Sequence, residues 1–366
     1  MKIVHVTDCM EVGGAETLVS QLCRLQRAQG HIPSVYAVAA LGALGAQMRK
    51  DGFDVQANMG RNLPDAARNF YRIFSASRPD VVHLHNPTPT IYAAIPARIA
   101  GVPSIVSTRH SLVAPPHRKL MEAKYAVAAS SCDWVVGICD ATASNVKSLR
   151  TVAARKIVRV YNGAEKLIRV PRENWPRKSG FTLVYVGRLE PVKNHALLLK
   201  AFCSALKSMP ELRLWMVGDG SERKAMESLA AALGVSSRVT FWGQQLDVAP
   251  FFSAADAFIM SSSSEGLPIS LLQAFSLGLP AIVTDVGGMA EVVRLARAGV
   301  TVSPADPAGM AAAILRMATA DTERAQFSAS AEESFHARFT LQTMMDAYMN
   351  LYRETPRARR GANRHF

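Results

Sequence analysis

Two cations lie five residues apart on a loop that follows a predicted strand. The loop reads GRLEPVKNH and contains Gly187, Arg188 and Lys193. Arginine offers a planar fork of donors and lysine a point charge, so the pair could stabilise the negative charge that develops on a diphosphate leaving group. The alternative interpretation is two ordinary solvated surface cations.

A glycine pair opens the first predicted helix. Gly13 and Gly14 come between the first predicted strand and a helix expected over residues 15–29. Glycine lets backbone amides approach an anion closely, and the N-terminus of a helix adds positive potential. The pair is consistent with a phosphate contact, and a plain turn is the alternative.

A serine-rich loop precedes the helix predicted over residues 269–277. It reads SSSSEGLP. The carboxylate of Glu265 could accept hydrogen bonds from sugar hydroxyls, and the amides of Gly266 and Leu267 would be free to face a phosphate or a sugar. The alternative is that Ser264 or a neighbour caps the helix, with Glu265 favoured by the helix dipole.

Other polar residues near predicted strand ends have two interpretations each. His83 and His85 alternate on a buried strand, where a core histidine with satisfied hydrogen bonds competes with a ligand contact. Gln244 follows the strand predicted at 238–241 and could border a nucleobase. The five cysteines form no CxxC pair, so the sequence predicts neither a zinc site nor a disulfide framework, which fits a reducing cytoplasm.

Short β-branched segments alternate with helical segments along the chain. Strands are predicted at 2–6, 35–39, 81–84, 104–108, 134–138, 157–160, 182–186, 213–217, 238–241, 257–260, 281–284 and 300–302. This alternation predicts an α/β protein with two Rossmann-like, doubly wound domains, each a parallel sheet covered on both faces. Ligands of such sheets bind at the carboxyl ends of the strands, so we expect a cleft where the two domains face each other.

The domain boundaries follow from the two rounds of alternation. We expect a first domain at 1–166, a linker at 167–180 and a second domain at 181–335. Apolar residues at helical spacing predict a closing helix at 336–354 that packs back on the first domain. A basic disordered tail is expected at 355–366.

Charge is unevenly distributed. The chain carries a formal net charge of +13, of which +9 falls in residues 1–166 and none in 167–352. This asymmetry predicts an anionic membrane surface or a lipid diphosphate as a partner of the first domain, with an ordinary solvated helix face as the alternative. Nucleic acid is not expected, because no basic motif is interleaved with aromatic residues. The residues expected to contribute are His117, Arg118, Lys119 and Lys124, with Leu120 and Met121 among them.

The apolar segments of the sequence bear on where in the cell the protein is found. No uncharged apolar run is long enough to span a bilayer, and Asp8 and Glu11 interrupt the apolar N-terminus too early for a signal peptide. We therefore expect a cytoplasmic protein that can lie peripherally on the inner face of the plasma membrane.

Taken together, these motifs resemble glycosyltransferase family 4. The GGAE turn, the GRLEPVKNH loop, the VGDGSER turn at 217–223 and the segment EGLPISLLQAFSLGLPAIVTDVGG at 265–288 carry the resemblance, which spans essentially the whole chain. It implies the GT-B fold and a retaining transfer from a UDP- or GDP-linked sugar, with the donor as a substrate and no cofactor. It also implies that no metal takes part in catalysis, and no Asp-x-Asp occurs in the sequence.

The resemblance also implies site residues. In similar enzymes the residues matching Arg188 and Lys193 hold the donor diphosphate, and the glycine turn of the first domain touches the phosphates. The residue matching Glu265 holds the donor sugar, and a histidine matching His110 faces it. Gln273 departs from the family pattern, which has a glutamate there for the ribose hydroxyls; glutamine keeps one acceptor but no charge.

The resemblance therefore implies a hexosyltransferase in bacterial cell-surface polysaccharide or glycolipid synthesis. The first domain would hold a glycan or lipid-linked acceptor and the second the nucleotide sugar. One alternative is a nucleotide-sugar epimerase of the same fold, which the GRL…K and EG-P blocks argue against. Another is a catalytically weak or inactive GT-B protein that binds nucleotide sugars or a membrane surface as a regulator, which Gln273 favours. Donor hydrolysis or transfer would separate the active from the inactive protein.

Overall fold

The chain forms two compact units. The computed structural model describes residues 1–60, 62–112, 119–171 and 180–355. Met1–Gly163 and Leu341–Phe366 make up the first unit, and Ala164–Thr340 the second. The boundary lies three residues before the expected residue 166, and residues 336–340 belong to the second unit. Most of the expected linker and nearly all of the expected tail lie outside the described residues, although Thr355 is buried.

The first unit is built on a parallel sheet with the strand order β3-β2-β1-β4-β5-β6-β7. β3 was not predicted, because only one of its three residues, Val55, is apolar and buried. β2 begins and ends earlier than the range predicted from its apolar residues. The strands are β1 (Lys2–Thr7), β2 (Ile32–Ala37), β3 (Asp54–Gln56), β4 (Val81–His85), β5 (Ser104–Arg109), β6 (Trp134–Gly137) and β7 (Ile157–Arg159).

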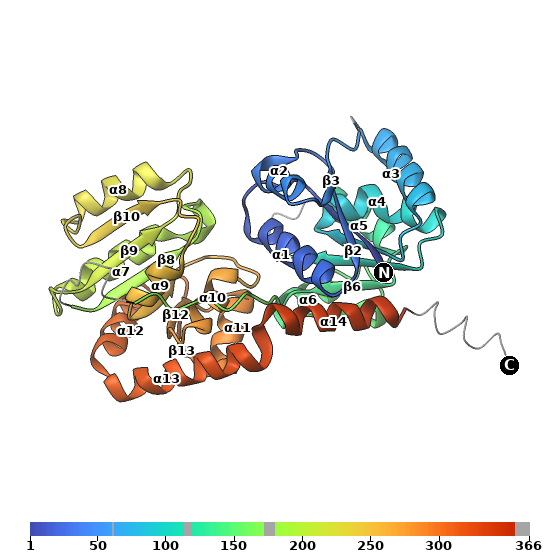
Figure 1. The fold of residues 1–366 in the computed structure, drawn as a ribbon. Coiled ribbons are helices and arrows are strands. Elements are labelled where there is room, and N and C mark those ends of the chain that lie inside the picture. The colour runs from blue at the N-terminus through green and yellow to red at the C-terminus, as the bar shows by residue number, and fades with distance from the viewer. Residues whose placement is uncertain (61, 113–118, 172–179, 356–366) are drawn as a thin grey trace. The chain divides into compact units, whose positions relative to one another are not determined.

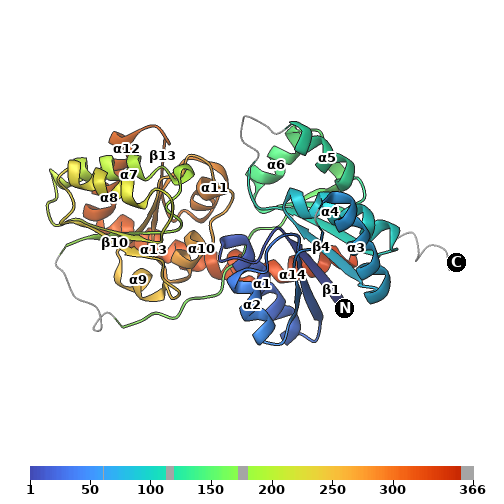
Figure 2. The ribbon, with the colours of Figure 1, turned by 90° about the horizontal axis from the view of Figure 1, so that it is seen from above.

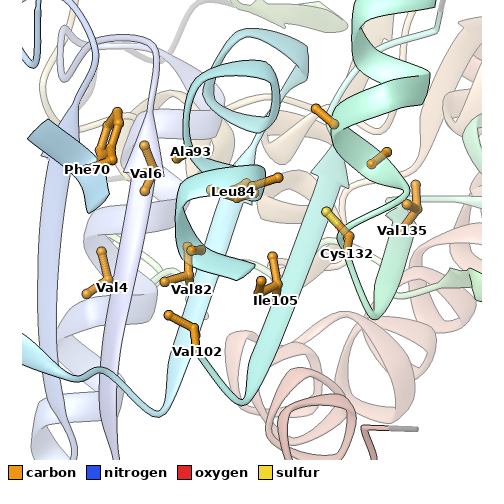
Figure 3. Close-up of a cluster of buried hydrophobic side chains, with 14 of the residues drawn as sticks. Val4, Val6, Phe70, Val82, Leu84, Ala93, Val102, Ile105, Cys132 and Val135 are labelled. Carbon is orange, nitrogen blue, oxygen red and sulfur yellow. The ribbon is translucent and has the colours of Figure 1, made fainter. Parts of the chain in front are cut away.

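Helices cover both faces of this sheet (Figure 1). α3, α4 and α5 pack on one another over a face that is apolar, as Figure 3 shows for Val4, Val82 and Ile105. α1 and α14 pack together on the opposite face, where buried histidines point. The helices are α1 (Gly14–Ala28), α2 (Gly42–Lys50), α3 (Leu63–Ser77), α4 (Pro87–Ile99), α5 (Lys119–Ala129), α6 (Asp140–Ser148), η1 (Ala154–Lys156) and α14 (Leu341–Arg353).

The second unit repeats this plan with the order β10-β9-β8-β11-β12-β13, again all parallel. α7 packs against α8 and α12, and α10 against α13 (Figure 2). The strands are β8 (Thr182–Val186), β9 (Arg213–Val217), β10 (Val239–Gly243), β11 (Ala257–Met260), β12 (Ala281–Thr284) and β13 (Gly299–Val302). The helices are η3 (Pro191–Lys193), α7 (His195–Leu206), α8 (Arg223–Ala232), α9 (Ala249–Ala254), α10 (Ile269–Ser276), α11 (Gly287–Ala296), α12 (Pro307–Thr319), α13 (Asp321–Ser334) and η4 (Phe335–Phe339).

The prediction of two doubly wound parallel sheets is confirmed. In each sheet the strand order reverses once, between β1 and β4 in the first unit and between β8 and β11 in the second. Loops leaving neighbouring strands part at such a point, so ligands of open α/β sheets bind there, beyond the carboxyl ends of the strands. Among the helices that the structure describes, none combines the length and hydropathy needed to cross a membrane.

Candidate functional site

The predicted residues of the second unit gather where its strand order reverses. The loop with Arg188 and Lys193 leaves β8, and the loop with Glu265 leaves β11, the next strand in the sheet. Parallel strands put their carboxyl ends at one edge, so residues about 70 positions apart in sequence become neighbours. The sheet topology thus accounts for the meeting of these two loops.

Lys193 and Glu265 form an ion pair. The Lys193 Nζ donates a hydrogen bond to the Glu265 Oε2, and the two side chains are only 15% and 17% exposed. The Ser262 hydroxyl donates to the same oxygen at 3.3 Å. Partial burial strengthens such a pair relative to one in open solvent. The interpretation of Lys193 as a solvated surface cation is therefore wrong.

Serine hydroxyls tie the two loops together. The Ser261 hydroxyl donates to the carbonyl oxygen of Lys193 at 2.9 Å, and the Ser263 backbone amide donates to that of Val192 at 2.8 Å. α10 starts at Ile269 after Pro268, and no side chain caps its N-terminus. The capping alternative for the serine run is therefore wrong, because these hydroxyls and amides hold the neighbouring loop.

Arg188 stands on the same loop with an exposed side chain. The Tyr185 hydroxyl donates to its carbonyl oxygen at 2.9 Å, which fixes the backbone. The loop is also pressed against the turn after β9: a Cβ on Gly218 would lie 1.9 Å from the Gly187 carbonyl oxygen. Within the described ranges, the Arg188 guanidinium has no hydrogen bond or ion pair, so it is available to an anion.

The remaining predicted residues of this unit lie around these loops. Gly266 and Leu267 are buried and already have interaction partners, so they are not free as we expected. Gln273 is half-buried on α10. Gln244 is exposed directly after β10, the edge strand, with β9 between β10 and β8. The Lys193–Glu265 contact thus directly links two of the predicted residues of this unit.

In the first unit the glycine turn follows β1 and begins α1. A Cβ on Gly13 would lie 2.4 Å from the Glu16 Oε2, whereas one on Gly14 would meet open space. The Glu16 carboxylate thus lies close against Gly13, and because it is the end of a flexible side chain it could move away. That carboxylate lies at the end of the helix where an anion is also favoured, so a phosphate here would have to displace it.

His110 follows β5 and is linked to four other polar residues, three of them through one series of hydrogen bonds. Its Nε2 lies 3.1 Å from the His85 Nδ1, the His85 Nε2 lies 3.0 Å from the His5 Nδ1, and the His5 Nε2 lies 2.9 Å from the Gln26 Oε1. The backbone amide of His110 donates to the Asn86 Oδ1 at 3.2 Å. Sequence reasoning missed His5 and Gln26, although a histidine inside the apolar run of β1 was a signal.

His83 has the core role that the sequence suggested. Its Nδ1 lies 2.7 Å from the Tyr352 hydroxyl and its Nε2 lies 2.7 Å from the Thr108 hydroxyl. Both ring nitrogens are thus satisfied inside the unit. His85, by contrast, connects the core to His110 at the end of β5, so the two histidines of the HLH sequence have different roles.

Family models match both units. The model described as Glycosyltransferase Family 4 matches residues 12–165, and the model described as Glycosyl transferases group 1 matches residues 170–334. Together they cover most of the chain. The chain therefore belongs to the family 4, group 1 glycosyltransferases, a family of transferase enzymes.

Among curated proteins, two from Rhizobium meliloti (strain 1021) are similar to the chain. The lipopolysaccharide core biosynthesis glycosyltransferase LpsE is 29% identical over 61% of this chain and 65% of LpsE. Its counterpart LpsD is 34% identical over 47% of this chain and 49% of LpsD. The aligned part of the chain thus spans about half to two thirds of the length of these relatives.

A solved structure has the same fold over nearly its whole length. Anabaena HepE in complex with UDP superimposes with a TM-score of 0.85 at 20% identity, covering 96% of this chain and 99% of HepE. A further structure of HepE, in complex with UDP-glucose, superimposes with a TM-score of 0.84 at 19% identity. The expected GT-B fold is therefore confirmed.

Acidification should lower the free energy of unfolding through the buried histidines. Burial lowers the pKa of His5 and that of His110 to about 4, against an ordinary value of 6.5. The unfolded chain therefore binds protons first. Their contribution to stability is fully present above about pH 6.5 and is lost as the pH falls toward 4, with about 3 kcal/mol from the fully buried His5.

Urea denaturation at pH 7, 6 and 5 measures this dependence in a window above the ordinary range of carboxyl groups. His5→Gln should flatten the dependence. His336→Gln, which replaces an exposed histidine of the second unit, should leave it unchanged. If the free energy of unfolding depended on pH equally in wild type and His5→Gln, protonation of His5 would not be a cause of the acid destabilisation.

Proposed function

We propose that the chain transfers a hexose from a UDP- or GDP-linked sugar to a glycan or lipid-linked acceptor, in cell-surface polysaccharide or glycolipid synthesis. The similarity to LpsE and LpsD, two lipopolysaccharide core biosynthesis glycosyltransferases, supports the pathway, and the UDP-glucose complex of HepE supports the donor class. The family resemblance supports a retaining reaction with no cofactor and no catalytic metal.

The observation that carries the proposal is the contact between Lys193 and Glu265 at the reversal of strand order. A cation suited to a diphosphate and a carboxylate suited to sugar hydroxyls lie side by side, as a nucleotide sugar would need. Arg188 adds an exposed guanidinium on the same loop. The three groups match the charge pattern of the donor along its length.

Donor binding would exchange the partners of these groups. Diphosphate oxygens would draw the Lys193 ammonium away from Glu265, and the released carboxylate would accept hydrogen bonds from the sugar. When the bond from the anomeric carbon to the diphosphate breaks, negative charge grows on the leaving oxygen. Arg188 and Lys193 would stabilise the transition state, in which this charge develops, more strongly than they stabilise the bound donor. This difference lowers the barrier.

A catalytically weak or inactive nucleotide-sugar binder is the second candidate. Gln273 favours it, because an uncharged side chain stands where the family has a glutamate for the ribose. Such a protein would bind nucleotide sugars with no transfer and no donor hydrolysis. Turnover of the donor therefore separates the two candidates.

A membrane surface is a further proposed partner. On α5 the exposed residues Leu120, Lys124 and Val127 follow the spacing of one helix face, and Lys119 is exposed beside them. Met121 is half-buried, and His117 and Arg118 lie outside the described residues. Two exposed aliphatic side chains among lysines suit an anionic headgroup boundary. A peripheral position on the inner face of the plasma membrane would follow.

Removing either leaving-group cation should lower kcat. We expect Arg188→Ala and Lys193→Ala each to reduce kcat by about 10²-fold, on the scale of removing one oxyanion donor. The measurement is sugar transfer or donor hydrolysis with UDP- and GDP-sugars, with and without EDTA. Lys200→Ala, an exposed cation on α7, should retain wild-type turnover. Wild-type kcat in both Arg188→Ala and Lys193→Ala would refute the assignment, and loss of activity in EDTA would refute the metal-free reaction.

Restoring the family's glutamate should strengthen nucleotide binding. Hydrogen bonds to an ionised acceptor are worth about 1 kcal/mol more than neutral ones, so Gln273→Glu should lower the Kd by about fivefold. Calorimetric titration with UDP, GDP and ADP measures this and identifies the base. Gln326→Glu is the matched control, because it adds the same charge at an exposed position on α13 of the same unit. An unchanged Kd in Gln273→Glu would mean that the ribose does not contact this residue.

Membrane binding should depend on lipid charge and on α5. The chain should co-sediment with vesicles containing anionic lipid at low salt and not with neutral vesicles. Because each surface cation contributes about 1 kcal/mol, the double variant Lys119→Glu, Lys124→Glu should bind at least tenfold more weakly. Lys200→Glu, Lys207→Glu carries the same charge change on the second unit and should bind like wild type. Equal loss in both double variants would exclude a role specific to α5.

A further inference from the structure

One face of the first sheet carries histidines on neighbouring strands. β1 and β4 pair with His5 opposite His83, and β4 and β5 pair with His85 opposite Thr108. Because side chains alternate along a strand and paired residues share a face, all of these side chains point the same way. They lie on the face opposite the apolar one in Figure 3, under α1 and α14.

Hydrogen bonds join part of this set into a continuous chain. It runs from Gln26 on α1 through His5 and His85 to His110, with separations of 2.9, 3.0 and 3.1 Å between the bonded atoms. Gln26, His5 and His85 are almost completely buried, whereas His110 is half-buried at the carboxyl end of β5. The chain therefore leads from the core to the sheet edge where ligands of this fold bind.

The three histidines of this hydrogen-bonded series are uncharged at neutral pH. Burial lowers the pKa of His5 and that of His110 to about 4 and lowers that of His85 well below its usual range. A neutral imidazole has one nitrogen that donates and one that accepts. Two neighbouring rings can therefore be bonded only if one donates and the other accepts.

The hydrogen bond between Gln26 and His5 determines which ring nitrogen donates in each of the other hydrogen bonds. With the Gln26 carbonyl oxygen facing His5, as in this structure, that oxygen can only accept, so the proton of His5 is on its Nε2 and its Nδ1 accepts. His85 then donates from its Nε2, and its own Nδ1 accepts from the Nε2 of His110. The one remaining ring nitrogen, the Nδ1 of His110, carries no proton.

We propose that His5 and His85 are positioning residues that hold His110 in its Nε2–H tautomer, so that its bare Nδ1 accepts a hydrogen bond from a hydroxyl of the donor sugar. This inference rests on the proposed function, which supplies the sugar. The two buried histidines touch no substrate and act only through His110. They also set its ring plane, since the bond from His85 orients the imidazole.

His83 lies beside the hydrogen-bonded series but does not determine which ring nitrogens of that series carry protons. Its nitrogens bond the hydroxyls of Tyr352 and Thr108, and the Tyr348 hydroxyl lies 3.1 Å from that of Thr108. A hydroxyl can donate or accept, so this branch is compatible with either tautomer. Tyr348 therefore offers a control within the same buried polar cluster.

A metal ion is the competing use of these histidines. Ligand atoms of His5, His83 and His85 lie within 4.8 Å of one another. However, both nitrogens of all three rings already have hydrogen-bond partners at 2.7–3.1 Å. An ion would have to break these bonds and leave the Gln26 carbonyl without its donor. The geometry favours the hydrogen-bonded chain.

The test reads the tautomer of His110 by nitrogen NMR of the full chain labelled with ¹⁵N-histidine. His85→Gln keeps one donor and one acceptor, whereas His85→Leu keeps the bulk and removes both. We expect the Nε2–H form in wild type, His85→Gln and Tyr348→Phe, and a mixture of tautomers in His85→Leu. Gln26→Met removes the acceptor at the far end and should also give a mixture, which covers the case that His85→Leu does not fold.

Kinetics separate the sugar contact from nucleotide binding. His85→Leu should reduce kcat/KM for the nucleotide sugar by about tenfold, while its Kd for the free nucleoside diphosphate stays at the wild-type value and His85→Gln regains most of the loss. An Nδ1–H tautomer in wild type, an unchanged tautomer in both His85→Leu and Gln26→Met, or one bound zinc per chain after incubation with zinc would overturn the proposal. The NMR result stands without turnover, so failure of the proposed transferase activity is recognised separately.

Discussion

Parallel strand pairing is the constraint on which both candidate sites depend. A parallel strand must be followed by a crossover, so each loop at the carboxyl end of a strand leads into a helix on one face of the sheet. Where the strand order reverses, the loops of two neighbouring strands lead to opposite faces. In the second unit this places Lys193 beside Glu265. In the first the strands on either side of the reversal, β1 and β4, carry His5 and His85, whose ring nitrogens lie 3.0 Å apart.

Burial then decides what the polar groups can do. In the first unit it removes the charge from the histidines, and a neutral imidazole without water must find a donor and an acceptor among its neighbours. The chain from Gln26 to His110 satisfies that requirement and orders the proton positions as a consequence. In the second unit partial burial leaves Lys193 and Glu265 paired, because either alone would bear the desolvation cost uncompensated. The hydrogen bonds from Gln26 to His110 and the Lys193–Glu265 ion pair thus satisfy buried polar groups and also fix the orientation of the candidate site residues.

The sequence predicted the elements better than the contacts. The buried strands of both sheets were predictable because their apolar runs are bounded by turn residues, whereas β3 was missed because its edge position requires one apolar residue, Val55. The loop with Lys193 was predictable by motif, but its partner depends on sheet order, which no local pattern encodes. The serine run was open to a capping interpretation for the same reason. His5 was missed because one polar residue in an apolar strand has no periodicity of its own.

If the chain binds a nucleotide sugar as proposed, the ion pair between Lys193 and Glu265 would suit both the diphosphate and the sugar of that ligand. While paired, each group satisfies the other, so neither is left as an isolated charge at a half-buried edge. A nucleotide sugar offers Lys193 a stronger anion and offers Glu265 hydroxyl donors, so the exchange costs little for this ligand. A free sugar offers nothing to Lys193, and a free diphosphate offers nothing to Glu265. Under the proposed function the pair would therefore select for the intact donor, since only that ligand offers a new partner to both Lys193 and Glu265.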